Sequence, residues 1–229
     1  MARLPADPEN FIRANTALEQ PAMVPEFRLW LATEYVPIWQ ATEAWLEEQN
    51  VDPPYWAFCW PGGQAVARYL LDNPDHVRAK RVIDFDAGSG VSSMAAAQAG
   101  AHSVVANDID LLSLVAARLN AGVNGLAVET SADDWLANPE SAPPADVVIA
   151  GDVCYEREMS TRALAWLRSH ANAGRLVLLG DPGRNYFSAQ GLQELARYEI
   201  PTSLQLENRG MRETVVWRVL PHPGDVRIP

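Results

Sequence analysis

Short apolar runs alternate with alanine-rich segments of helical periodicity through the middle of the chain. The apolar runs predict strands at 82–83, 103–106, 146–150 and 176–179. The segments between them predict helices at 91–99, 111–121 and 158–172. Strand and helix in alternation are typical of an α/β protein with a doubly wound parallel sheet. Such sheets bind ligands beyond the carboxyl ends of their strands, so the residues after each run are the candidates for function.

The two flanks of this alternation have different patterns. Residues 1–60 are rich in proline and tryptophan, and helical spacing at 38–49 predicts an N-terminal helical cap. A second helix is expected after Pro61-Gly62-Gly63, with a stop at Pro74. Apolar stretches at 198–206 and 214–220, joined by Asn208-Arg209-Gly210, predict a terminal antiparallel hairpin. We expect one domain over 1–229, with the cap at 1–60, the core at 61–220 and a tail at 221–229.

Composition narrows the classes of function. A chain of 229 residues with 48% hydrophobic content can bury a sizeable core. Its formal net charge of −11 disfavours nucleic acid and anionic membranes as partners. Cys59 and Cys154 are too few for a disulfide framework or a zinc site, so no metal is expected. Without a signal-peptide pattern or a run long enough to span a membrane, we expect a cytoplasmic protein.

The turn after the first apolar run is a candidate ligand loop. Glycines at 88 and 90 let a backbone approach a ligand closely, and the helix behind them favours an anionic group. A tight turn between strand and helix is the alternative interpretation. The candidate residues of this turn are Asp84, Asp86, Ala87, Gly88, Ser89 and Gly90.

The second run ends in Asn107-Asp108-Ile109-Asp110. An acid at this place in a nucleotide-binding fold accepts hydrogen bonds from ribose hydroxyls. The alternative for Asp108 is a solvated acid that caps the next helix.

A glycine-rich loop without a phosphate-binding lysine, followed by an acid after the second strand, resembles the class I S-adenosylmethionine-dependent methyltransferases. The resemblance implies a mostly parallel seven-stranded sheet and S-adenosylmethionine as cofactor. It implies that the loop backbone holds the methionine part, that Asp108 and Ile109 border the ribose, and that Asp133 or Asp134 binds the adenine amino group. Trp135 is either a stacking face for adenine or a partly buried aromatic at a helix start.

The fourth run ends in Gly151-Asp152-Val153-Cys154-Tyr155-Glu156, which resembles the Asp-x-x-Tyr motif of protein-lysine methyltransferases. Four further stretches, at 11–16, 54–65, 179–184 and 214–218, are similar to the family that methylates lysines of the electron-transfer flavoprotein β-subunit. The implied partner is that protein. The loop departs from the family at Asp86, where glycine is usual, and a carboxylate there would lie near the cofactor's own carboxylate.

Methyl transfer to lysine needs a neutral amine held in line with the methyl group. Asp152 and Glu156 are suited to orient the amine, while Tyr155 offers a ring face and a hydroxyl. Trp56, Phe58 and Trp60 are interpreted either as walls of the pocket, with Gly151 and Trp60 beside the cofactor, or as core aromatics. Arg184 is either a clamp for an acidic feature of the substrate or a solvated turn residue.

The leading hypothesis is therefore an S-adenosylmethionine-dependent protein-lysine N-methyltransferase acting on the electron-transfer flavoprotein β-subunit. A small-molecule amine N-methyltransferase is the first alternative. The second is a non-catalytic binding protein in which Asp86 prevents cofactor binding.

Overall fold

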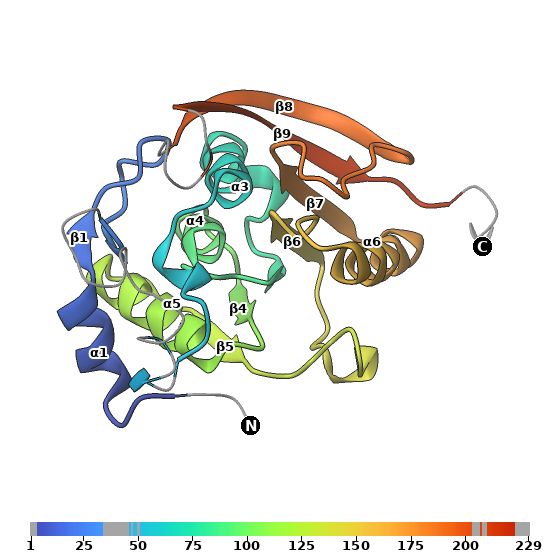
Figure 1. Ribbon diagram of the computed structural model, residues 1–229. Helices are drawn as coiled ribbons and strands as arrows, with labels where there is room; N and C mark the ends of the chain where they lie inside the picture. The colour runs from blue at the N-terminus through green and yellow to red at the C-terminus, as the bar shows by residue number, and fades with distance from the viewer. Residues whose placement is uncertain are drawn as a thin grey trace.

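The structure is a computed structural model that describes residues 4–33, 46, 48, 49, 51–202, 207 and 210–222. Its centre is a seven-stranded sheet in the order β5-β4-β3-β6-β7-β9-β8, with helices on both faces (Figure 1). The strands are β3 Arg81–Phe85, β4 Ser103–Asn107, β5 Glu129–Ser131, β6 Val147–Gly151, β7 Leu176–Asp181, β8 Leu192–Pro201 and β9 Met211–Val219. The helices beside it are α3 Pro61–Asp72, α4 Val91–Gln98, α5 Leu111–Val123 and α6 Arg157–Asn172.

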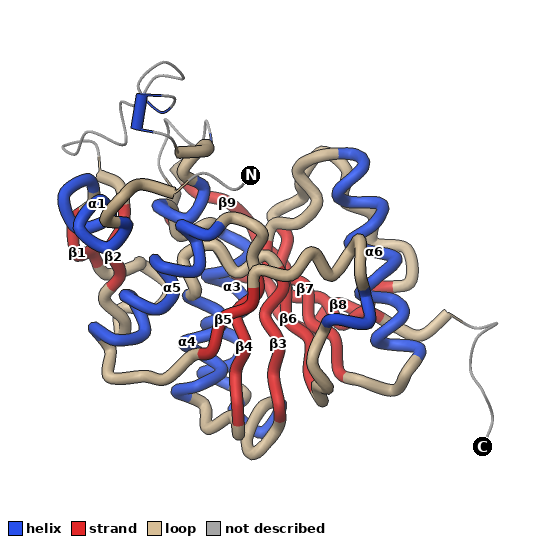
Figure 2. The backbone as a smooth tube through the Cα atoms, turned by 90° about the horizontal axis from the view of Figure 1, so that it is seen from below, coloured by secondary structure: helices blue, strands red, loops and turns tan. Residues whose placement is uncertain are grey.

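Five strands are parallel, and β9 runs against them. β8 pairs antiparallel to β9, so it runs in the same direction as the five. The chain builds outward from β3 through β4 to β5, and then returns to the other side of β3 with β6 and β7. Figure 2 shows β3, β4 and β5 lengthwise. The order reverses between β3 and β6, so the crevice for a ligand lies at the carboxyl ends of these two strands. The predicted fold class is confirmed.

Alternation along the strands divides the core between the two faces of the sheet. Val82 of β3 packs in a cluster with residues of α3 and α4. Its neighbour Ile83 packs on the other face with Trp166 and Leu167 of α6. Since both faces are covered by helices, the central strands are mostly apolar, as is typical of parallel sheets. This rigid centre fixes the turns that follow β3 and β6.

The terminal hairpin is confirmed, but its first strand begins at Leu192 and ends at Pro201, not at 198 and 206. The error arises at 192–197, where Leu-Gln-Glu-Leu-Ala-Arg has the spacing of a helix. In the structure this half is an edge strand with exposed acids and a register shift between Glu194 and Ala196. Residues 203–206 of the predicted strand and 208–209 of the predicted connection lie outside the described residues.

The N-terminal region is only partly the helical cap that the sequence predicts. It contains a helix, α1 Pro8–Asn15, and also a two-stranded antiparallel sheet of β1 Ala17–Glu19 and β2 Leu29–Leu31. Phe11, Ile12 and Trp56 pack with Leu112 and Val115 of α5, which attaches this region to the core. Most of the helix predicted at 38–49, and the tail from 223, lie outside the described residues.

The described residues also form single turns of 3₁₀ helix at η2 Tyr55–Ala57, η3 Pro74–His76 and η4 Pro139–Ser141. The predicted stop of α3 at Pro74 agrees with the end of that helix at Asp72. Within the part of the chain that the structure describes, no helix combines the length and apolar character needed to cross a membrane.

Candidate active site

The turn after β3 has the backbone of a ligand-binding loop. Asp86, Gly88 and Gly90 have φ values of 59°, 51° and 78°, all in the left-handed region. A Cβ on Gly88 would meet no atom within 4 Å, so the space beside this residue is open. A Cβ on Gly90 would lie 2.8 Å from the Cβ of Ala117 in α5, which excludes larger residues there. The turn is therefore packed tightly on one side and open on the other.

Asp84 and Asn120 hold this turn from behind. The Asp84 carboxylate is 1% exposed and accepts a 2.6 Å hydrogen bond from Ser93 Oγ of α4. Burial raises the pKa of Asp84 to about 7. The Asn120 amide donates to the carbonyl of Ser89 at 2.9 Å. The expected cofactor contact through Asp84 is thus corrected: its carboxylate is bonded inside the protein and braces the loop.

Asp108 faces the same turn from the end of β4. It accepts hydrogen bonds from the backbone N–H of Gly88 at 3.1 Å and of Asp110 at 2.9 Å. Burial raises its pKa to about 6. Next to it, Ile109 is 67% exposed, although the side chain is large and apolar. An acid and an exposed apolar residue side by side fit the ribose and base of a nucleoside.

The loop after β5 contains Trp135 and the two candidate adenine-binding acids, Asp133 and Asp134. Trp135 is fully buried and stacks on Trp166 of α6 at 5.8 Å between ring centroids. The predicted stacking of Trp135 on adenine is therefore wrong, and the residue is a core aromatic. Asp134 accepts hydrogen bonds from the backbone N–H groups of residues 136 and 137, which stabilises the following turn. The Asp133 side chain is exposed and accepts a hydrogen bond from the Ser131 hydroxyl, while its backbone carbonyl accepts one from the Asn107 amide at 2.9 Å.

The turn after β6 contains Asp152, which lies on the other side of the site from Asp108 and Ile109. Asp152 has a φ of 61° and accepts a 3.2 Å hydrogen bond from the backbone N–H of Gly63 at the start of α3. Gly151 lies against the same helix end, since a Cβ on it would be 2.6 Å from the Gly63 nitrogen. The smallness of Gly151 is therefore explained by packing on α3. The α3 N-terminus carries partial positive charge, which favours the carboxylate that it meets.

Tyr155 and Glu156 continue from Asp152 to the surface. The Tyr155 ring is 47% exposed and lies 6.1 Å from the ring of Tyr55. Burial of its hydroxyl, together with the charges of Asp86 and Asp108, raises the pKa of Tyr155 above its usual value. The hydroxyl therefore lies near acids from the turns after both β3 and β4. Glu156 is exposed at the start of α6.

The aromatic residues before α3 have separate roles. Trp56 is fully buried against α5, so its predicted role in substrate binding is wrong and the core interpretation holds. Trp60 donates its indole N–H to the carbonyl of Tyr55, and its ring is 5.6 Å from that of Phe58. Trp60 and Phe58 are half-buried, beside the exposed Tyr55.

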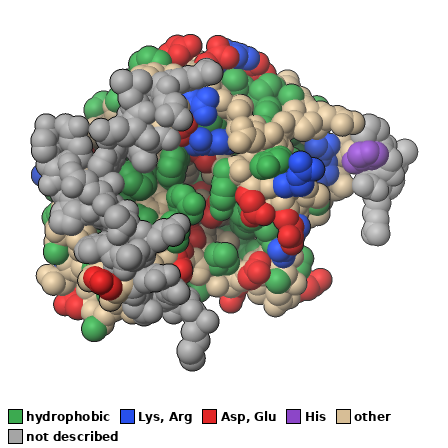
Figure 3. Space-filling model, in the orientation of Figure 1, with side chains coloured by type: hydrophobic (Ala, Val, Ile, Leu, Met, Phe, Trp, Pro, Cys, Tyr) green, Lys and Arg blue, Asp and Glu red, His purple; other side chains and the backbone are tan. Residues whose placement is uncertain are grey.

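Figure 3 shows apolar and acidic side chains gathered around a hollow in the middle of the surface.

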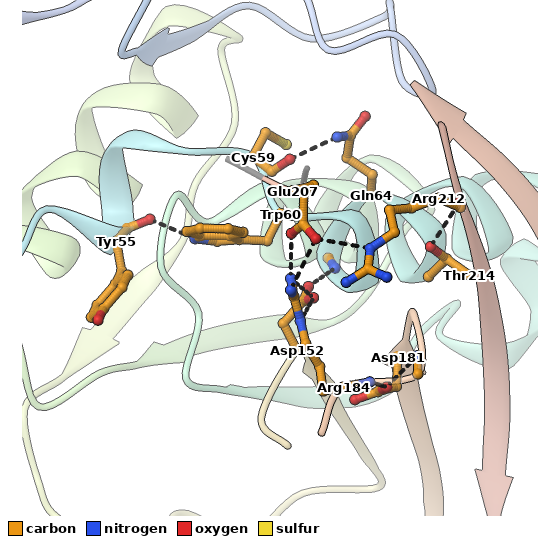
Figure 4. A network of polar contacts seen from close by, with 12 residues as sticks. Tyr55, Cys59, Trp60, Gln64, Asp152, Asp181, Arg184, Glu207, Arg212 and Thr214 are labelled. Atoms are coloured by element: carbon orange, nitrogen blue, oxygen red, sulfur yellow. Dashed lines mark hydrogen bonds and ion pairs between the residues drawn. The ribbon is translucent and has the colours of Figure 1, made fainter. Parts of the chain in front are cut away.

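Arg184 is neither a clamp for the substrate nor a solvated turn residue, the two roles that the sequence suggested. Its side chain is 14% exposed and forms ion pairs with Asp152 at 2.6 Å and with Glu207 at 2.8 Å (Figure 4). Its guanidinium also lies over the Trp60 ring at 5.4 Å from the centroid. The arginine is thus a buried counterion within the protein, and both the substrate clamp and the solvated turn residue are corrected.

Asp86 is the most crowded charge of the site. Burial and the carboxylates of Asp108, Asp84 and Asp152 raise the pKa of Asp86 well above its usual value. No hydrogen bond to its side chain is present among the described residues. A cationic group arriving at this turn would therefore meet several acids. Within the described part of the chain, Asp152 is the one of them that is paired with an arginine.

Three contributors to the site have no local signal in the sequence. Glu207 joins Arg184 to Arg212, Asp181 bonds the backbone of Gly183 and Arg184, and Gly180 packs against Gly62. The stretch around Pro61 and the motif after β7 are both similar to one family. That likeness could have pointed to their contact, but nothing in the spacing of the residues does.

Comparison with known proteins extends this geometry. Residues 67–153 match the family model "Ribosomal protein L11 methyltransferase (PrmA)". The ribosomal protein L11 methylase of Lactobacillus delbrueckii subsp. bulgaricus shares the fold with a TM-score of 0.52 and 23% identity, covering 82% of this chain and 94% of that one. Magnesium protoporphyrin IX methyltransferase from Synechocystis PCC 6803, solved with S-adenosylmethionine bound, shares the fold with a TM-score of 0.50 and 20% sequence identity. The match covers 68% of this chain and 77% of that one.

A full-length relative identifies the family. The electron transfer flavoprotein beta subunit lysine methyltransferase of Xenopus laevis is 39% identical over 220 residues, which cover 93% of this chain and 87% of the Xenopus protein. The fold, the loop after β3 and the acid after β4 agree with this relationship. The chain belongs to the electron transfer flavoprotein beta subunit lysine methyltransferase family, and it is an enzyme whose cofactor is S-adenosylmethionine.

Proposed function

We propose that this protein methylates the side-chain amine of lysine in the electron-transfer flavoprotein β-subunit. The observation that carries the proposal is the 39% identity over 93% of the chain to a relative named for that activity. The site also supports it, because the turns after β3, β4 and β6 carry acids suited to a ribose and to an amine, and Figure 3 shows a hollow lined by apolar and acidic side chains.

The residues around the turn after β3 fit the cofactor. The open space at Gly88 admits a ligand against the backbone, and the exposed side chain of Ile109 offers an apolar contact for adenine. We assign the ribose hydroxyls to Asp108 and the adenine amino group to Asp133, because Asp134 already stabilises its own turn. When bound, S-adenosylmethionine supplies the methyl group as a sulfonium.

Asp152, Tyr155 and Glu156 are assigned to the incoming amine. Asp152 is fixed by Gly63 and Arg184, so it can accept a hydrogen bond from the amine in one defined direction. Tyr155 keeps its proton at neutral pH, since the ordinary tyrosine pKa is near 10 and burial raises it further. Its exposed ring can contact the lysine methylenes. Glu156 lies at the surface, where it can receive the proton that lysine loses before methyl transfer.

The test uses the purified chain, S-adenosylmethionine with a deuterated methyl group, and purified electron-transfer flavoprotein. We expect labelled methyl-lysine in tryptic peptides of the β-subunit. The variant Asp152→Asn, which preserves the size of the side chain, should form little product while it still binds S-adenosylhomocysteine in calorimetry. A matched Arg81→Gln variant at the opposite end of the sheet serves as the control for handling and folding.

Two results would overturn the proposal. Label that appears in small amines of an extract, and in no protein, would favour a small-molecule N-methyltransferase. An absence of both label and binding heat would favour a non-catalytic protein, and recovery of binding in Asp86→Gly would assign the cause to Asp86.

A further inference from the structure

Arg184 lies between two buried carboxylates that come from distant parts of the chain. Its Nε and Nη2 donate to Asp152 Oδ1 at 3.0 and 2.6 Å. Its Nη1 and Nη2 donate to Glu207 at 3.1 and 2.8 Å. Glu207 also accepts from Arg212 Nε at 2.8 Å, so acids and arginines alternate in one chain of contacts (Figure 4). The side chains of Asp152 and Glu207 are only 10% and 3% exposed, which keeps water from weakening these contacts.

The direction of the Arg184 side chain is fixed from its backbone. Asp181 Oδ1 accepts from the backbone N–H groups of both Gly183 and Arg184 at 2.7 Å. Gly183 has a φ of 77°, which turns the chain sharply after β7. The Trp60 ring then covers one face of the guanidinium. Arg184 is therefore held in place before any substrate arrives.

These contacts leave Asp152 with one acceptor position for a ligand. A carboxylate offers about four positions for hydrogen bonds. Two are taken on Oδ1 by Arg184, and one is taken on Oδ2 by the backbone N–H of Gly63. The position that remains lies on Oδ2. It suits a single N–H donor of a ligand.

The charge at this carboxylate determines which form of the substrate it favours. An ionised acid without a counterion stabilises an ammonium ion, whose nitrogen has no lone pair with which to attack. A guanidinium on the other side of the same acid removes much of that preference. The other groups that face Asp152 are Asp86 from the turn after β3, Asp181 from the end of β7, Glu207, and the thiols of Cys59 and Cys154. Since the charged ones are all acidic, Arg184 is the only cation within the described part of the chain that is bonded to Asp152.

We propose that Arg184 is a positioning residue that neutralises and orients Asp152, so that Asp152 accepts a hydrogen bond from a neutral substrate amine instead of retaining an ammonium ion. The inference deepens the proposed function and depends on it. Arg184 itself does not touch the reacting atoms and acts through Asp152. Glu207 and Asp181 support it by holding the guanidinium and the backbone.

The test measures kcat against pH with electron-transfer flavoprotein as substrate, because kcat reports the ionisation of groups in the enzyme–substrate complex. Four variants are compared with the wild type: Arg184→Gln, Arg184→Lys, the double variant Arg184→Gln with Glu207→Gln, and Arg81→Gln. The double variant removes one charge of each sign, so it keeps the inference testable if the single Arg184→Gln protein does not fold. Arg81 is the matched control because its guanidinium also bonds an aspartate, Asp146, but at the far end of β3.

We expect the pH at which kcat is half-maximal to be higher by about one to two pH units in the two proteins that carry Arg184→Gln. Their kcat is then about 10 to 100-fold below wild type near neutral pH and recovers at high pH, while KM changes little. Arg184→Lys, which keeps the charge, should stay within about half a pH unit of wild type. Arg81→Gln should follow the wild-type curve.

A uniform loss of kcat at every pH in the double variant would overturn the inference and leave Arg184 as a structural residue. A wild-type protein that methylates no lysine of the flavoprotein would instead refute the proposed function. The two failures are distinguishable, because the first requires an active wild-type enzyme.

Discussion

The two sides of the active site are both rich in aspartate, but they differ in how that charge is balanced. On the side of β3 and β4, Asp86 and Asp108 face each other with no arginine bonded to either among the described residues. On the side of β6 and β7, Asp152 is bonded to Arg184 and to the backbone of α3. The first side presents acids with no bonded arginine among the described residues to an incoming ligand, and the second is suited to hold a neutral amine. The same residue type thus serves two tasks because its partners differ.

The largest expected effect lies on the side of β6 and β7, called the balanced side because Arg184 is bonded to Asp152 there. The side of β3 and β4 is called the unbalanced side. Asp152→Asn removes the charge that Arg184 and Gly63 meet, and it weakens the acceptor for the amine. We expect kcat to fall by about 10³-fold, in the range of a lost general-base or orienting group. The measurement is methyl transfer at saturating substrate, with binding of S-adenosylhomocysteine as the control. Activity within a few-fold of wild type would remove Asp152 from the amine site.

Close backbone packing is a second requirement of the balanced side. A Cβ on Gly62 would lie 2.4 Å from the Gly180 carbonyl and 2.5 Å from Asp152 Oδ2. Because backbone cannot move aside cheaply, Gly62→Ala should lower the free energy of unfolding by about 3 kcal/mol. Gly122→Ala in α5 is the control, since a Cβ on Gly122 would meet no atom within 4 Å and the helix should gain up to about 1 kcal/mol. Equal effects of the two substitutions in denaturant melts would contradict the packing.

Asp86 tests the unbalanced side. Asp86→Gly removes a carboxylate from beside Asp108 and relieves a left-handed backbone that costs an aspartate about 1 kcal/mol. We expect S-adenosylhomocysteine to bind about 10-fold more tightly, measured by calorimetry at neutral pH. Asp86→Asn separates the two causes, because it removes the charge and keeps the side chain. Weaker binding in both variants would show that Asp86 holds the cofactor.

The smallest expected effect is a pH dependence behind the loop. The pKa of Asp84 in the folded protein is about 7, above its unfolded value near 4. The folded state therefore holds this proton more tightly, and the stability that Asp84 contributes is full below about pH 4 and is lost as the pH rises through 7. Relative to Asp84→Asn, the wild type should lose about 1 to 2 kcal/mol between pH 4.5 and 7.5 in chemical denaturation. Parallel stability curves for the two proteins would contradict this result.

Much of the fold could be predicted from the sequence because the pattern is local. The strands β3, β4, β6 and β7 are short apolar runs, and the acids of the site follow directly after them. Placing Asp108 and Asp152 at one edge of the sheet needs only the parallel order of the strands. Position along a strand therefore indicated where the candidate residues lie.

The features that the sequence did not predict depend on contacts between residues far apart in the chain. Trp135 has the sequence context of a residue beside the adenine site, but Trp166 of α6 covers it. Arg184 has the context of a loop residue until Glu207 is placed beside it. The pairing of Gly62 with Gly180 is equally invisible to periodicity. Burial and charge compensation are decided by tertiary packing, which no local pattern contains.

The most direct test of the central claim is a crystal structure of the full chain with S-adenosylhomocysteine. We expect the ribose at Asp108, the base beside Ile109 and Asp133, and the sulfur facing Asp152 and Tyr155. A ligand bound elsewhere, or an Asp152 carboxylate separated from the sulfur by packed protein, would contradict it.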